Sequence, residues 1–133
     1  MTVGRLLIVD DQPAFANFVA RVGREMGYEV ETANHADEFI AAYPRFDPDL
    51  IVLDVVMPDR DGVELIRWLA GQHCRARIIV ASGYNPSYAR MTKLIGTAMG
   101  GLTITTLAKP VPLAALRAAL DPAQNGAPAP PEA

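Results

Sequence analysis

Short runs of apolar residues recur along the chain and predict β-strands. Four short runs are typical of strands buried in a sheet and occupy residues 6–9, 50–53, 78–81 and 102–107. A fifth, weaker run over residues 28–32 carries charged residues at alternate positions, as a strand at the edge of a sheet would. The pattern therefore predicts five strands, one of them at an edge.

The segments between these runs have apolar residues at helical spacing. Helices are expected over residues 15–26, 36–43, 63–70, 86–99 and 112–120. Gly27 follows the first helix as a stop signal, Asn34 is a candidate N-cap of the second, and Pro44 ends its pattern. Strict alternation of strand and helix predicts an α/β fold with an open, five-stranded parallel sheet and helices on both faces.

Composition indicates one globular domain followed by a tail. The chain of 133 residues is long enough for one core, and half of its residues are hydrophobic. From Asp121 onward Pro, Ala, Asn and Gly dominate and the apolar period is lost. We therefore expect a domain over residues 1–121 and a flexible Pro/Ala-rich tail over residues 122–133, with no attached output module.

Charge and cysteine content exclude several classes of protein. Twelve basic and fifteen acidic residues leave a net charge of −3 without a Lys/Arg cluster, which argues against direct nucleic-acid binding. Cys74 is the only cysteine, so an internal disulfide or a Cys-based metal site is excluded and a reducing cytosol is favoured. The first apolar run is too short for a signal peptide or membrane span, which predicts a cytoplasmic protein.

Polar residues stand directly after four of the predicted strands. They are Asp10 and Asp11, Asp54, Ser82 and Gly83, and Lys109 with Pro110. Parallel strands end at one edge of a sheet, so these groups are expected to converge there. Three carboxylates repel one another unless a hard divalent cation binds between them, and Mg²⁺ is the natural candidate. An ammonium and a hydroxyl suit phosphate oxygens, so the set predicts a phosphoryl site.

Each of these groups has a simpler interpretation when taken alone. Asp10 and Asp11 could cap the first helix, and Asp54 could be an ordinary residue at a strand end. Ser82 could belong to a turn, and Lys109 could be a solvated charge. The interpretation as a site depends on all four groups standing at the same end of their own strands.

These residues carry a resemblance to a known family that covers residues 5–120. The sequence resembles the receiver domain of two-component response regulators in four places: Asp10-Asp11, residues 54–62 (DVVMPDRDG), Ala81-Ser82-Gly83 and Ala108-Lys109-Pro110. The resemblance implies a doubly wound, flavodoxin-like (βα)5 fold. It also implies a phosphoprotein that acts in a two-component system or phosphorelay.

The resemblance implies a role for each acidic residue. Asp54 would be the phosphoacceptor, which receives a phosphoryl group from a histidine kinase or phosphotransfer protein. Asp11 and Asp54 would bind Mg²⁺ directly, and Asp10 would act largely through water. The backbone carbonyl of Val56 would add a further metal ligand.

The resemblance also assigns the remaining polar groups. Lys109 would neutralise charge on the transferring phosphoryl group, which agrees with the physics of phosphoryl transfer. A cis Lys109–Pro110 bond would aim the Lys109 ammonium into the site. Ser82 would move inward after transfer and hydrogen-bond a phosphoryl oxygen. Residues 57–58 and Gly62 would shape the loop beside the acceptor, where a purely structural role is an equal alternative.

Two features depart from the family pattern. Thr106 stands where active members commonly carry a Tyr or Phe that reports phosphorylation, and Tyr84 is a candidate replacement whose alternative is a solvated loop residue. The interval from Ser82 to Lys109 is 109 − 82 = 27 positions, which is longer than usual and predicts an enlarged fourth helix or flanking loop. These departures concern the mode of output more than the chemistry.

The resemblance also implies that two positions influence how long the aspartyl phosphate survives: the second residue after the acceptor and the second residue after Ser82. They are Val56 and Tyr84, an apolar and a bulky residue that would impede the attacking water. We therefore expect slow self-dephosphorylation, which rapid loss of label from phosphatase-free protein with Mg²⁺ would refute.

The leading functional prediction is a phosphoacceptor protein rather than an enzyme. Its only expected catalysis is self-phosphorylation from small donors and slow self-dephosphorylation. Its partners would be a kinase or phosphotransfer protein and a downstream target, with a homodimer as a further option. The alternative is a degenerate receiver that acts as a phosphate-independent interaction module, which Thr106 favours slightly. A metal-dependent hydrolase is disfavoured by the adjacent Asp10-Asp11 pair, and a dinucleotide-binding protein by the lack of a Gly-rich turn.

Overall fold

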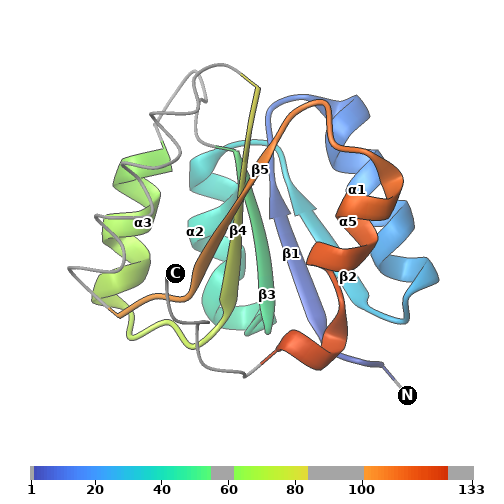
Figure 1. Cartoon of the computed structure of the whole chain (residues 1–133). Helices are drawn as coiled ribbons and strands as arrows, with labels where there is room; N and C mark the ends of the chain where they lie inside the picture. The colour runs from blue at the N-terminus through green and yellow to red at the C-terminus, as the bar shows by residue number, and fades with distance from the viewer. Residues whose placement is uncertain (1, 55–61, 84–100, 126–133) are drawn as a thin grey trace.

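The computed structural model describes residues 2–54, 62–83 and 101–125, and its strands form one parallel sheet (Figure 1). The strands are β1 Arg5–Val9, β2 Glu29–Ala33, β3 Leu50–Asp54, β4 Arg77–Ser82 and β5 Ile104–Ala108. Their spatial order is β2-β1-β3-β4-β5, and all four neighbouring pairs are parallel. The predicted open five-stranded sheet is confirmed, with the charged strand β2 at one edge.

Helices cover both faces of the sheet. They are α1 Pro13–Glu25, α2 Ala36–Phe46, α3 Gly62–Gly71 and α5 Leu113–Ala119. Figure 1 shows α1 and α5 side by side on one face, and α2 and α3 on the other. This is the doubly wound arrangement expected from the sequence.

The helix expected over residues 86–99 lies outside the described residues. Among the described helices, none is long and apolar enough to cross a bilayer.

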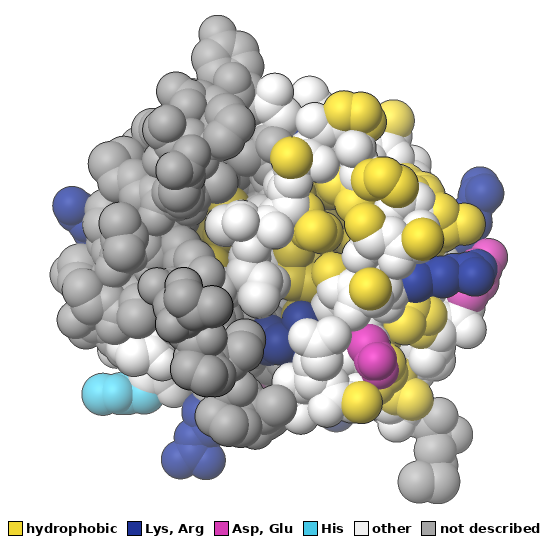
Figure 2. Space-filling view, in the orientation of Figure 1, with side chains coloured by type: hydrophobic (Ala, Val, Ile, Leu, Met, Phe, Trp, Pro, Cys, Tyr) yellow, Lys and Arg dark blue, Asp and Glu magenta, His cyan; other side chains and the backbone are white. Residues whose placement is uncertain are grey.

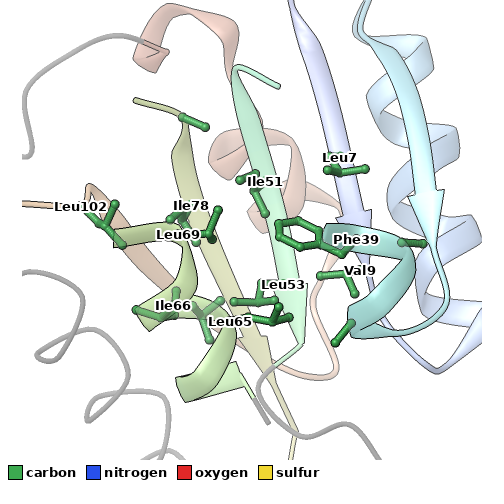
Figure 3. Close-up of a cluster of buried hydrophobic side chains, with 14 of the residues drawn as sticks. Leu7, Val9, Phe39, Ile51, Leu53, Leu65, Ile66, Leu69, Ile78 and Leu102 are labelled. Atoms are coloured by element: carbon green, nitrogen blue, oxygen red, sulfur yellow. The ribbon is translucent and has the colours of Figure 1, made fainter. Parts of the chain in front are cut away.

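The inner strands β1, β3 and β4 are apolar on both sides because each side meets a layer of helices. Leu7, Ile51 and Leu53 pack with α2 and α3 around Phe39 (Figure 3), whereas the alternate residues, such as Ile8 in β1, pack against α1 and α5. Side chains alternate between the two faces of a strand, so an uninterrupted apolar run supplies both cores. Truncation of one such buried side chain to Ala typically costs about 2–5 kcal/mol.

The ends of α2 differ from the local sequence signals. The helix continues past Pro44 to Phe46, where Asp47 adopts a left-handed conformation with φ 49° and donates its N–H to the Tyr43 carbonyl at 3.0 Å. Burial of the Phe46 side chain accounts for this extension, so the prediction that Pro44 ends the helix is wrong.

The N-cap prediction for α2 is also wrong. The N-cap is His35, and its side chain makes no capping hydrogen bond. Instead, Glu38 reaches back and accepts a hydrogen bond from the backbone N–H of Asn34 at 3.1 Å. A carboxylate in the first helical turn therefore accepts a hydrogen bond from the backbone that leads into the helix, and the Asn34 side chain is not needed as the cap.

Residues 122–125, which composition assigned to the tail, pack against the domain. A 3₁₀ turn spans Pro122–Gln124, and the Asp121 side chain accepts the Ala123 N–H at 3.0 Å. The Asn125 side chain then bonds Arg77 of β4 and Tyr28. The boundary between domain and tail stays a prediction, because residues 126–133 lie outside the described residues.

Candidate functional site

Three carboxylates meet at the C-terminal ends of β1 and β3. Asp10 follows β1 directly, and Asp54 is the last residue of β3. The pairing of Val9 with Leu53 in these neighbouring strands sets the two aspartates side by side. Carboxylate oxygens of Asp10, Asp11 and Asp54 all lie within 4.8 Å of one another. The convergence expected from the strand order is therefore present.

Two of these carboxylates are shielded from water. Asp10 is 1% exposed and Asp54 is 5% exposed, whereas Asp11 is open to solvent. Asp10 is held from both sides, because its Oδ1 accepts the Gln12 N–H at 2.8 Å and its Oδ2 accepts from Lys109 Nζ at 2.9 Å. A buried carboxylate needs such partners, since its desolvation is otherwise costly.

Lys109 brings the positive charge of the site from the end of β5. Its ammonium lies 2.9 Å from Asp10 Oδ2 and 3.6 Å from Asp54 Oδ2, and its side chain is 12% exposed. The peptide bond between Lys109 and Pro110 is cis, as predicted. Three carboxylates and one ammonium leave a formal charge of −2, which matches one divalent cation. Clustered carboxylate oxygens are the ligands that Mg²⁺ prefers, so the residues present fit this ion.

Ser82 and Gly83 stand at the same edge of the sheet. Ser82 is the last residue of β4, and it pairs with Ala108, the residue before Lys109. A Cβ atom added to Gly83 would lie 3.0 Å from Cβ of Lys109, which is closer than side chains normally approach. Gly83 therefore leaves room for the lysine, a role that its interpretation as a turn residue did not include.

The remaining predicted residues divide into two groups. Thr106 lies on β5 and is exposed. Val56, the predicted backbone ligand, lies outside the described residues, as do Tyr84 and the loop residues 57–58. No described contact bears on the roles predicted for them.

Two residues at the site were missed by sequence reasoning. Gln12 Oε1 accepts a hydrogen bond from Lys109 Nζ at 3.1 Å, and the same ammonium lies 4.4 Å from the centroid of the Phe15 ring. Phe15 shares the helical spacing of core residues, so the pattern could not distinguish it from them. Its position within one turn of the acidic pair, at the end of α1 that faces the strand ends, is the signal that could have identified it.

These groups line one cleft of about 780 Å³. Its walls include Asp11, Asp54 and Lys109 on the polar side and Phe15 and Val111 on the apolar side. Figure 2 shows hydrophobic side chains at the surface over α1 and α5, and Leu113 of α5 is 46% exposed. The site is thus an acidic and ammonium-bearing pocket with an apolar wall.

Comparison with known proteins shows the family to which the chain is similar. The family model for the response regulator receiver domain matches residues 6–121. The transcriptional regulatory protein TrcR of Mycobacterium tuberculosis is 43% identical over 63 residues, which are 47% of this chain and 24% of that protein. This chain thus spans only about a quarter of TrcR. The chemotaxis protein CheY of Halobacterium salinarum is 27% identical over 106 residues, which are 80% of this chain and 88% of that protein.

A solved structure shows the same similarity in three dimensions. The chain matches the crystal structure of a CheY-like response regulator receiver domain protein from Methanospirillum hungatei JF-1 with a TM-score of 0.72 and 27% sequence identity. The match covers 88% of this chain and 93% of that one. The similarity therefore extends over nearly the whole of both chains.

Proposed function

Because the chain belongs to the family of response regulator receiver domains, we propose that it accepts a phosphoryl group on Asp54 with Mg²⁺ bound beside it. Domains of this family are phosphoacceptor signalling modules of two-component systems rather than enzymes that turn over a substrate. The choice of Asp54, the metal ligands and the partners are the parts that we propose for this chain.

One observation carries the proposal: Asp54 is a nearly buried carboxylate with two more carboxylates and an ammonium around it. Oxygens of Asp10 and Asp11 lie within 4.8 Å of it, and Lys109 Nζ lies 3.6 Å from its Oδ2. A carboxylate in this position is accessible through the cleft and faces fixed positive charge. Such a group suits attack on a phosphorus atom, whose bond to the donor breaks as the bond to Asp54 forms.

The surrounding residues supply the electrostatics of this transfer. Asp10, Asp11 and Asp54 would hold Mg²⁺, which when bound neutralises negative charge on the phosphoryl oxygens. Lys109 would donate to one of these oxygens from its position beside Asp54, and Ser82 would donate to another after transfer. The Val56 carbonyl stays a predicted metal ligand.

The donor and the target are proposed from the family. A histidine kinase or phosphotransfer protein would supply the phosphoryl group, and a separate downstream protein would bind the phosphorylated form. A degenerate receiver that binds partners without phosphate is the second candidate, and Thr106 on β5 is the observation in its favour. The complete acidic set and Lys109 favour the phosphoacceptor, because an interaction module has no need for buried carboxylates at close range.

Intact mass measurement tests the proposal. The protein is incubated with Mg²⁺ and acetyl phosphate, and wild type is compared with Asp54→Asn and the control Asp47→Asn. Asp47 adopts a left-handed conformation that Asn also tolerates, so the control removes a carboxylate outside the site with little strain. We expect one phosphoryl group on wild type and control, dependent on Mg²⁺, and none on Asp54→Asn.

Two outcomes of this experiment would contradict the proposal. Some receiver domains ignore small donors, so a negative result is repeated with a cognate kinase. Failure of the wild type with both donors would favour the phosphate-independent interaction module. Equal phosphorylation of Asp54→Asn would show that another residue is the acceptor.

A further inference from the structure

The Lys109 ammonium is held mainly by residues between the end of β1 and the first turn of α1. Its Nζ donates to Asp10 Oδ2 at 2.9 Å and to Gln12 Oε1 at 3.1 Å, whereas Asp54 Oδ2 is 3.6 Å away. The ring of Phe15 covers the ammonium at 4.4 Å from the ring centroid. Two neutral groups therefore hold the ammonium together with the carboxylates.

Backbone hydrogen bonds hold the segment that carries both neutral groups. The N–H of Gln12 donates to Asp10 Oδ1 at 2.8 Å, and its carbonyl accepts the Ala16 N–H at 3.1 Å as the first hydrogen bond of α1. Phe15 follows three residues later, so it lies on the same side of the helix start. Pro13 between them restricts the backbone where the helix begins. The side chains of Gln12 and Phe15 thus approach Lys109 from one hydrogen-bonded segment.

We infer that Gln12 and Phe15 are positioning residues, which hold the Lys109 ammonium at the mouth of the site before a phosphoryl group arrives. This inference rests on the proposed function. A free lysine side chain samples many rotamers, and a charge already in place adds to the rate because it needs no reorganisation during transfer.

The neutrality of the two groups is important for this role. A third carboxylate on the ammonium would compete with the incoming phosphoryl oxygens for its charge. An amide oxygen and an aromatic face attract a cation more weakly than a carboxylate does. Lys109 can therefore donate a hydrogen bond to an oxygen of the phosphoryl group. The two residues thus act on the rate of transfer and should leave metal binding, which uses the three carboxylates, unchanged.

The rate of phosphorylation provides the first test. With acetyl phosphate and saturating Mg²⁺, we expect Gln12→Ala and Phe15→Leu each to lower the initial rate by about three- to tenfold. Phe15→Tyr keeps the ring and should restore the wild-type rate. Tyr43→Leu is the control, because it removes a ring of α2 that contacts Phe39 and Trp68 on the other face of the sheet and leaves the contact of Phe15 with Lys109 in place. The Mg²⁺ concentration for half-maximal rate should stay the same in all of them.

The second test does not depend on phosphorylation. The chain has two lysines, Lys93 and Lys109, so lysine-selective ¹³C labelling gives two sets of side-chain NMR signals, which Lys93→Arg assigns. We expect the ε-methylene protons of Lys109 to be shifted upfield by the Phe15 ring. The shift should persist in Phe15→Tyr and Tyr43→Leu, vanish in Phe15→Leu and decrease in Gln12→Ala.

The two tests separate the possible failures. Absence of the upfield shift in the wild type would overturn the inference whether or not Asp54 is phosphorylated. Unchanged or faster phosphorylation of Gln12→Ala and Phe15→Leu would also overturn it, since the residues would then not assist transfer. A wild type that shows the shift but takes up no phosphoryl group from any donor refutes the proposed function, and the positioning role in transfer is then refuted with it.

Discussion

At the scale of single residues, a buried guanidinium lies at the opposite end of the sheet from Asp54. Arg77 begins β4 and is 4% exposed, and burial lowers its pKa. Its Nε and Nη2 donate to Asn125 Oδ1 at 3.3 and 3.2 Å, and Asn125 Nδ2 donates to the Tyr28 hydroxyl at 2.9 Å. That hydroxyl donates to the Leu120 carbonyl at 2.6 Å. One amide side chain therefore connects Arg77 with Tyr28.

Removal of this amide should destabilise the domain. Asn125→Ala leaves the Arg77 guanidinium without its side-chain acceptor, so we expect the free energy of unfolding to fall by about 1–3 kcal/mol. Urea unfolding of the full chain measures the change. Gln124→Ala is the matched control, because Gln124 donates to the Ala118 carbonyl from an exposed position and its loss should cost less than about 1 kcal/mol. Equal effects of the two substitutions would contradict a special role for Asn125.

At the scale of elements, strands were easier to predict than helix ends. An uninterrupted apolar run such as that of β3 can be read directly, because both faces of the strand are buried. The ends of α2 were missed because the local signals of Asn34 and Pro44 competed with tertiary contacts. Phe46 is buried only in the folded chain, and Glu38 accepts a hydrogen bond from the Asn34 backbone only there. The preferences of single residues for helix ends do not include such contacts.

The packing of α1 on the sheet predicts opposite effects of one substitution at two sites. A Cβ atom added to Gly23 would lie 2.7 Å from Leu6 Cδ2 and 3.3 Å from Val30 Cγ2, whereas one at Gly71 in α3 would meet nothing within 4 Å. We expect Gly23→Ala to lower the free energy of unfolding by about 1–3 kcal/mol, because the core is overpacked. Gly71→Ala should raise it by up to about 1 kcal/mol through helix propensity. Stabilisation by Gly23→Ala, measured by urea unfolding, would contradict this packing of α1.

At the scale of the whole molecule, topology explains which parts of the site were predictable. The doubly wound order brings the ends of β1, β3 and β5 to one edge, so Asp10, Asp54 and Lys109 could be grouped from strand positions alone. Gln12 and Phe15 could not, because their contribution depends on the direction in which α1 leaves the sheet. Strand order thus predicts the charged centre of the site, and the geometry of the loops decides what surrounds it.

The formal charge of −2 at this edge predicts that metal binding stabilises the entire fold. A ligand that binds only the folded state raises the free energy of unfolding, by about 2.7 kcal/mol at a concentration of 100 Kd. We therefore expect added Mg²⁺ to raise the urea midpoint and a chelator to reverse the change. Asp11→Asn should remove most of this response while the fold is retained, since Asp11 is exposed. Asp47→Asn should respond like wild type, and an equal response of Asp11→Asn would show that Mg²⁺ acts somewhere other than this cluster.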